Sequence, residues 1–585
     1  MISVSAFGLL FLVLGWVHSG QIKYTPKVST LSGPVVGLVS GSSLGDVYYF
    51  LGIPYGQPPT GDLRFQRPKP AEKWNDILEA TELPKSCPQP RTSIRYVRRG
   101  MSEDCLYLNI ITPPGALKDQ NSRRPVMIDL GRNFFYNSGA GTDFIDQLYP
   151  LVLKQDVIVV TVDFRKNIFG FAYTSADDGL NGNYGMWDQN LAMNWVKDNI
   201  KSFGGDPNRV TVTGTVLGSA MIEGHIFSPF ARGLFQNAIL ESETLTVLNE
   251  KVNERVEEST YIVMDRVNCK NAKDRLACLQ DVDMEDLISA LPNRFSAFQP
   301  VPDSDYIPVT AEDISNMKTG NDKPNVNLLF GYGKGEDGLI VASVAPNIFA
   351  DQRLTYSDAE DFIATYFEDG SVDKLAESYI GDKNGVISIR KIQEGLMNLV
   401  TDVLVSCPLI RDARALADGQ QKGMTYFFVF NHYANTKAFP ICDLQPELGI
   451  CPKDIIIFNY GIPYTDDYFF SYTPEDRKMA DVLMNVWGNF ARTGSPSANN
   501  NDWSSWNGKK SNSPVAILTS KGSTIDRSIS NYCLENVQKL EDSLIDPKYY
   551  PLDQYTIPKQ TKVDYNSSYD GLLFDELYYM AFQHY

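Results

Sequence analysis

One stretch of this chain, residues 203–229, constrains the fold more than any other. It reads FGGDPNRVTVTGTVLGSAMIEGHIFSP. The β-branched run Val210–Val212 predicts a short buried strand, and the apolar spacing from Ser219 to Phe227 predicts a helix. Gly214 and Gly218 bracket the link between them, which predicts a tight turn. Strand, sharp turn and helix in this order push the side chain at the apex out at the top of a sheet.

The side chain at that apex belongs to Val216. In the catalytic version of this turn, G-x-S-x-G, a serine stands at the apex and attacks a carbonyl carbon. Valine has no atom that can make this attack. The neighbouring hydroxyls of Thr215 and Ser219 lie off the apex, so we expect them to point elsewhere. The stretch therefore predicts the architecture of a hydrolase without its nucleophile.

The surrounding sequence predicts the class of the fold. Val126–Leu130 and Val157–Val162 are continuous apolar runs of strand length, as expected for strands that are covered on both faces. Asp188–Ile200 carries a helical stripe of apolar residues. Strands that alternate with helices indicate an α/β fold, in which a large, mainly parallel twisted sheet carries helices on both faces.

The charge balance excludes two classes of partner. Among 585 residues, 71 are Asp or Glu and 53 are Lys or Arg, which gives a net charge of −18. Nucleic acids and anionic membrane surfaces repel a strongly acidic chain, so we expect neither as a partner. A basic protein or a cation fits this charge. A soluble extracellular protein that is kept dispersed by its charge fits it equally well.

The N-terminus predicts secretion. Residues 1–20 contain an apolar run from Ala6 to Val17 that is followed by the small residues Ser19 and Gly20, a pattern typical of a cleaved signal peptide. No later apolar run reaches the roughly eighteen residues that a membrane span needs. The sequence therefore predicts a secreted, extracellular protein without a membrane span.

The C-terminus has a different composition from the rest of the chain. Residues 541–585 are rich in tyrosine and acidic residues, which predicts a solvated segment without a packed core. The segment carries the chain's N-glycosylation sequon at Asn566. Its tyrosines are candidates for sulfation or for binding a partner, and a tail without a specific role is the alternative. We therefore expect a signal peptide, one large domain over residues 21–540, and this tail.

Eight cysteines indicate an oxidising compartment and structural disulfides. Spacing predicts that Cys87 pairs with Cys105 and that Cys269 pairs with Cys278. Three connectivities stay open for the other four, which are Cys407, Cys442, Cys451 and Cys533. None of the eight shows the close spacing of a zinc site, so we expect no metal and no cofactor.

Several motifs together resemble the carboxylesterase and cholinesterase family. They are FLGIPYGQPPTGDLRFQRPKP (50–70), SEDCLYLNIITP (102–113), VIVVTVDFRKNIFGF (157–171), GNYGMWDQNLAMNWVKDNIKSFGGDPNRVTVTG (182–214), SPFARGLFQNAIL (228–240) and MADVLMNVWGNFARTGSPS (479–497). The resemblance covers roughly residues 30–540. It implies the α/β-hydrolase fold.

The resemblance also implies where catalytic groups would stand. Val216 falls at the nucleophile position, and Glu336 falls at the position of the acid. The family's oxyanion loop is glycine-rich, because its backbone N–H groups must approach the substrate. At these positions the chain carries bulkier residues, which are Arg132, Asn133 and Phe134. Glu336 is expected to serve hydrogen bonding, with a role in a new binding site as the alternative.

The family's histidine base is also missing. It precedes a segment that here begins at Asp454, and the chain has Cys451 near that place and no histidine between Cys442 and Asp454. Of the mature chain's histidines, His225 is expected to be a packed or surface residue. His432 is expected to make a structural hydrogen bond, and the third, His584, lies in the tail.

These losses predict a secreted, catalytically degenerate pseudoenzyme that binds an extracellular protein. It resembles the noncatalytic cholinesterase-like adhesion proteins, such as neurotactin, gliotactin, glutactin and the neuroligins. The family's helical dimer face also allows a homodimer. Two alternatives are a carrier of a small apolar ligand in the degenerate gorge and a secreted storage or structural protein. An active carboxylic ester hydrolase with displaced residues ranks last.

Overall fold

The structure is a computed structural model. It describes residues 23–533 except for the segments 91–99, 120–122, 132–144, 177, 246–251, 293–296, 303, 311–312, 314–324, 337–340, 342–347, 349–353, 368, 420–422, 435–449, 451–453, 466–471, 498–502, 507–512 and 530–532. Several predictions fall outside the described residues. These are the signal peptide, the tail with Asn566, the oxyanion positions Arg132, Asn133 and Phe134, and the cysteines Cys442 and Cys451.

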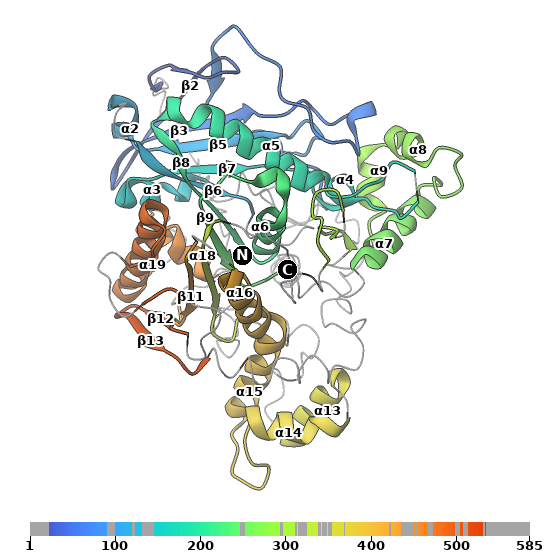
Figure 1. The fold of residues 1–585 in the computed structure, drawn as a ribbon, viewed down its shortest axis with the longest axis vertical. Helices are drawn as coiled ribbons and strands as arrows, with labels where there is room; N and C mark the ends of the chain where they lie inside the picture. Colours follow the sequence, from blue (N-terminus) through green and yellow to red (C-terminus); the bar gives the residue numbers. More distant parts are fainter. Residues whose placement is uncertain are drawn as a thin grey trace, which may run out of the picture.

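A single large sheet runs through the molecule (Figure 1). Its strand order is β1-β2-β3-β5-β7-β6-β8-β9-β10-β11-β12-β13, and β4 pairs with β2. The strands are β1 Val28–Ser29, β2 Pro34–Ser42, β3 Gly45–Pro54, β4 Leu78–Ala80, β5 Tyr107–Thr112, β6 Arg124–Asp129, β7 Ile158–Val162, β8 Gly205–Thr215, β9 Asn237–Glu241, β10 Asn327–Gly333, β11 Thr425–Phe430, β12 Val515–Thr519 and β13 Gly522–Asp526.

The centre of the sheet is parallel and its edges are antiparallel. In the sheet order, every pair from β7 through β12 is parallel. The successive pairs from β1 to β7 in that order, and the pair β12 and β13, are antiparallel, whereas β4 lies parallel to β2. The apolar runs predicted as β6 and β7 are fully buried along almost their whole length. The predicted fold class is therefore confirmed.

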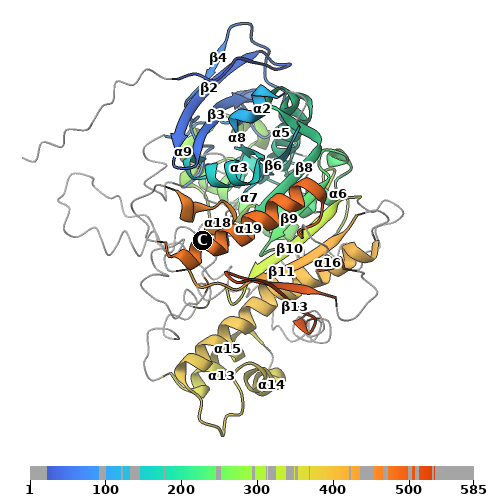
Figure 2. The same cartoon turned by 90° about the vertical axis from the view of Figure 1, so that its left-hand side faces the viewer.

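The described part of the chain forms helices, several of which cover the two faces of this sheet. They are α2 Pro114–Lys118, α3 Tyr149–Gln155, α4 Asn167–Phe171, α5 Tyr184–Asn199, α6 Leu217–Phe227, α7 Val252–Arg266, α8 Arg275–Asp281, α9 Met284–Ser289, α13 Tyr356–Tyr366, α14 Asp369–Tyr379, α15 Ile389–Thr401, α16 Cys407–Gly419, α18 Asp454–Asn459 and α19 Pro474–Thr493. Short 3-10 turns include η1 Gly61–Leu63 and η4 Pro229–Ala231, and a π-helical turn, η6 Asp402–Ser406, joins α15 to α16. α13 and α14 lie beyond the outer end of α15, away from the sheet (Figures 1 and 2).

Two hydrophobic cores lie on the two faces of the sheet. Ile128 and Val160 point into the core that contains α5, α6 and α16. Their neighbours Met127 and Val159 point into the core that contains α3, α18 and α19, the face seen in Figure 2. Alternate residues of one strand thus serve opposite cores, which is why both strands are apolar without a break.

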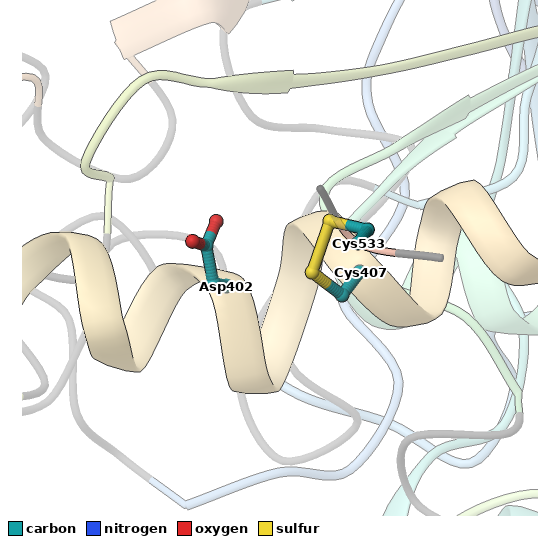
Figure 3. A group of neighbouring side chains, drawn as sticks. All are labelled: Asp402, Cys407 and Cys533. Carbon is teal, nitrogen blue, oxygen red and sulfur yellow. A yellow bond between two sulfur atoms is a disulfide. The ribbon is translucent and has the colours of Figure 1, made fainter. Parts of the chain in front are cut away.

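Three disulfides lie among the described residues. Cys87 bonds to Cys105, and Cys269 bonds to Cys278, as the spacing predicts. Of the four cysteines whose connectivity stayed open, Cys407 bonds to Cys533 across 126 residues of sequence (Figure 3). The helices in the described part of the chain include no segment that is long and apolar enough to cross a membrane.

Candidate functional site

The turn between β8 and α6 has the sharp geometry that the sequence predicts. Val216 lies between them with φ of 58° and ψ of −123°, and its N–H donates to the carbonyl oxygen of Glu241 at 2.8 Å. A positive φ is a genuine outlier for a β-branched residue and costs on the order of 1–3 kcal/mol. The surrounding structure therefore holds this residue in a strained conformation.

Glycines make this turn possible because three backbone segments approach one another there. A Cβ atom at Gly214 would lie 2.5 Å from the carbonyl carbon of Gly218. A Cβ atom at Gly218 would overlap the carbonyl oxygen of Gly131, the residue that follows β6 by two positions. The end of β8, the first turn of α6 and the chain after β6 thus pack backbone to backbone.

No attacking group stands at the apex. The Val216 side chain is 5% exposed. The hydroxyl of Thr215 donates to Oε2 of Glu241 at 2.8 Å, so a carboxylate already engages it. Ser219 is fully buried, and its hydroxyl has no hydrogen-bond partner among the residues that the structure describes. Neither neighbour therefore takes the place of a serine at the apex.

Glu336, which the family resemblance predicts at the acid position, is buried and held by hydrogen bonds. Its Oε2 accepts from the hydroxyl of Ser242 at 3.1 Å and from the N–H of Gly333 at 2.9 Å. Ile450 packs beside Gly333, because its Cγ2 would lie 3.3 Å from a Cβ atom there. The residue immediately before Cys451 thus reaches the loop that carries Glu336. Cys451 itself lies outside the described residues.

Both described histidines are engaged in hydrogen bonds. His225 is buried on α6, where its Nδ1 lies 2.7 Å from the hydroxyl of Tyr306 and its Nε2 lies 2.7 Å from Oε1 of Gln189. Burial lowers the pKa of His225 to about 3, so its imidazole is neutral. His432 follows β11, and its Nε2 lies 2.8 Å from Oδ1 of Asp476 at the start of α19. Both imidazoles therefore contact structural groups, which are Tyr306, Gln189 and Asp476.

The sequence did not reveal a buried network beside the apex. Both carboxylate oxygens of Glu241 lie 3.0 Å from Nδ2 of Asn459, and one of them also accepts from Thr215. Glu241 ends β9 and is fully buried. The one available signal was a carboxylate directly after the apolar run of β9, residues 238–240. The network fastens α18 to the turn that carries Val216.

A second buried carboxyl group lies deeper on α6. Glu223 is fully buried, and its Oε2 accepts from the N–H of Leu245 at 2.6 Å. Its Oε1 has no hydrogen-bond partner within the described part of the chain. Burial, together with the nearby charge of Asp412, raises the pKa of Glu223 well above its ordinary value.

Replacing Glu223 with glutamine is expected to stabilise the fold at neutral pH. The folded-state pKa is raised, so the folded chain binds more protons than the unfolded chain above the unfolded pKa. The stability that Glu223 contributes is therefore fully present below its unfolded-state pKa, and it is lost as pH rises through the folded-state pKa. Glutamine keeps an acceptor for Leu245 without the buried charge. We expect Glu223→Gln to gain about 1–3 kcal/mol at pH 7.5 in urea unfolding, and nothing at pH 4.

The matched control for this prediction is Glu377→Gln. Glu377 is exposed on α14, so its replacement is expected to change the unfolding free energy by less than about 0.5 kcal/mol at either pH. An equal gain for Glu223→Gln at pH 4 and pH 7.5 would contradict the assignment of a raised pKa to Glu223.

One group of side chains has the composition of a metal site. Asp402, Cys407 and Cys533 lie close together where η6 meets α16 (Figure 3). The two sulfur atoms are bonded to each other, so they offer no thiolate. Asp402 accepts hydrogen bonds from Tyr379 at 2.9 Å and from Ser406. The disulfide therefore acts as a structural link between the start of α16 and Cys533.

Comparison with known proteins assigns the chain to a family. Residues 24–534 match the model of the carboxylesterase family. The chain belongs to the carboxylesterase family. Acetylcholinesterase from Bungarus fasciatus is 33% identical to this family member over 496 residues, which are 80% of this chain and 78% of the acetylcholinesterase. Carboxylesterase 5A from Homo sapiens is 30% identical over 517 residues, which are 84% of this chain and 82% of that protein.

Proposed function

We propose that this carboxylesterase-family chain is a secreted pseudoenzyme that acts by binding an extracellular protein. The observation that carries the proposal is the valine at the strained apex. An ester hydrolase of this type needs an activated nucleophile at this point, and Val216 has no atom that can serve. The strained conformation is kept although it presents no reactive group.

The remaining catalytic groups support the same proposal. A base would have to lie near the apex, and the imidazoles of His225 and His432 are engaged with Tyr306, Gln189 and Asp476. The sequence places no histidine between Cys442 and Asp454, where the family has its base. Loss of the serine or the histidine alone removes about a millionfold of turnover in a serine protease. Both losses together leave Glu336 without a base to orient.

The relatives bear the names of enzymes, and those names lend no support to an adhesion role. Support for binding comes instead from what the chain keeps. The sheet, the two cores and the disulfides are intact around an apex that has no nucleophile. Secretion is supported by the N-terminal apolar run and by the disulfides, which persist in oxidising compartments.

The test is an ester-hydrolysis assay on the full chain expressed in a secretory host. We expect the protein in the medium to begin near Gln21, and we expect no turnover of p-nitrophenyl acetate, p-nitrophenyl butyrate or acetylthiocholine above a serum-albumin control. Intracellular retention of the chain would contradict secretion. Saturable turnover that survives repurification would contradict the pseudoenzyme proposal and would indicate a nucleophile at another position.

A further inference from the structure

A cluster of three aromatic rings, with an arginine packed on one of them, reaches from the core to the surface near the end of α6. Arg67, which follows η1, places its guanidinium carbon 4.0 Å from the ring centre of Trp187 on α5. Trp187 in turn lies 4.7 Å from the ring of Phe230 on η4 and 4.8 Å from the ring of Tyr306. Phe230 and Tyr306 are nearly parallel, with ring centres 6.0 Å apart. We call the three rings the aromatic platform.

The outer end of the platform meets solvent. Phe230 is 45% exposed, whereas Tyr306 is fully buried and Trp187 is partly buried between them. Beside the rings, Arg67 forms an ion pair with Asp305. Their side chains are 53% and 46% exposed. The surface therefore offers an aromatic face next to one donor-rich group and one acceptor-rich group.

Buried hydrogen bonds fix the platform from below. The Tyr306 hydroxyl bonds to His225, which bonds to Gln189. Gln189 donates to the carbonyl oxygen of Leu130 at the end of β6. The backbone of Phe230 accepts from Nδ2 of Asn190 at 3.0 Å. Because the rings are held in place without a ligand, binding costs little ordering entropy.

The charges beside the platform select the chemistry of a ligand. Arg67 and Asp305 neutralise each other as an ion pair, so a ligand of either charge gains no net attraction beside the platform. A purely apolar ligand covers the rings but strips water from the ion pair without replacing its hydrogen bonds. A neutral ring with an apolar CH face and hydroxyl groups at its edge can cover the aromatic rings and can also hydrogen-bond to the ion pair. Its CH face covers Phe230, and its hydroxyls donate to Asp305 and accept from Arg67.

We infer that the aromatic platform with Arg67 and Asp305 binds a pyranose ring of a neutral carbohydrate chain. Such a site gives an extracellular binding protein a way to recognise a glycosylated partner. The inference extends the proposed function to a class of partner. The residues of this site lie outside the strained turn of Val216. Carbohydrate binding and ester hydrolysis therefore test the two proposals separately.

The test uses the full-length protein and defined neutral tetrasaccharides, namely cellotetraose, N-acetylchitotetraose and mannotetraose. Binding is measured by saturation-transfer NMR and by tryptophan fluorescence titration. We expect saturable binding of at least one of them, with the sugar CH protons receiving saturation. Phe230→Ser is expected to raise the Kd by about 2- to 12-fold, since an aromatic contact contributes about 0.5–1.5 kcal/mol. Arg67→Gln is expected to raise it by a similar factor.

Two further variants separate recognition from folding. Phe230→Tyr keeps the ring and is expected to keep the Kd within about twofold. Val386→Ser removes a fully exposed apolar side chain between α14 and α15, and it is expected to change nothing. Absence of saturable binding for all three neutral sugars would overturn the inference. So would binding that Phe230→Ser and Val386→Ser alter equally, and so would binding of only a heparin tetrasaccharide or of a protein partner at the platform.

Discussion

Replacing Gly218 with alanine is expected to lower the free energy of unfolding by about 3 kcal/mol or more. A Cβ atom at this position would overlap the carbonyl oxygen of Gly131, and backbone yields less readily than the end of a flexible side chain. The first turn of α6 would have to move away from β6, and the strained conformation of Val216 would lose its support. Urea unfolding followed by tryptophan fluorescence gives the measurement.

Gly370→Ala is the control for this prediction. Gly370 lies near the start of α14, and nothing stands within 4 Å of a Cβ atom there. Alanine is favoured over glycine in a helix, so this variant is expected to be neutral or to gain up to about 1 kcal/mol. If Gly218→Ala unfolded at the same urea concentration as the unchanged protein, the close backbone approach of the three segments would be wrong.

Local patterns predicted the parts of the fold that depend on neighbours in sequence. The run Val210–Val212 predicted β8, and the glycine spacing predicted the tight turn. β8 starts earlier than the apolar run, because Gly205 pairs with Arg124 of β6. Pairing between distant segments carries no local signal, so the length of a strand was harder to predict than its existence.

Contacts between distant residues explain most of what the sequence did not reveal at the site. The carboxylate of Glu241 meets Asn459 across 218 positions. The ring of Trp187 on α5 meets Tyr306, which comes after α6, α7, α8 and α9 in the chain. The apex residue, by contrast, was predictable, because a strand, a turn and a helix fix it within a dozen residues.

Val216→Ser places a serine at the apex, where the catalytic form of this turn carries its nucleophile. We expect this variant to leave hydrolysis of p-nitrophenyl butyrate at background. A serine at the apex would carry a neutral hydroxyl, which is a weak nucleophile without a base. The buried imidazole of His225 is engaged by Tyr306 and Gln189, and protonating it is opposed by a pKa of about 3. Turnover by this variant alone would show that an unrecognised base reaches position 216.

The double variant Val216→Ser, Cys451→His adds a base where the family resemblance places one. Ile450, the residue before position 451, packs beside Gly333, whose N–H donates to Glu336. We expect turnover to stay about 100- to 1,000-fold below that of a working esterase, the usual cost of one missing oxyanion donor. A variant that reached full activity would show that Arg132, Asn133 and Phe134 still present their N–H groups to substrate. The residues at positions 216 and 451 would then account in full for the inactivity that we propose for the unchanged protein.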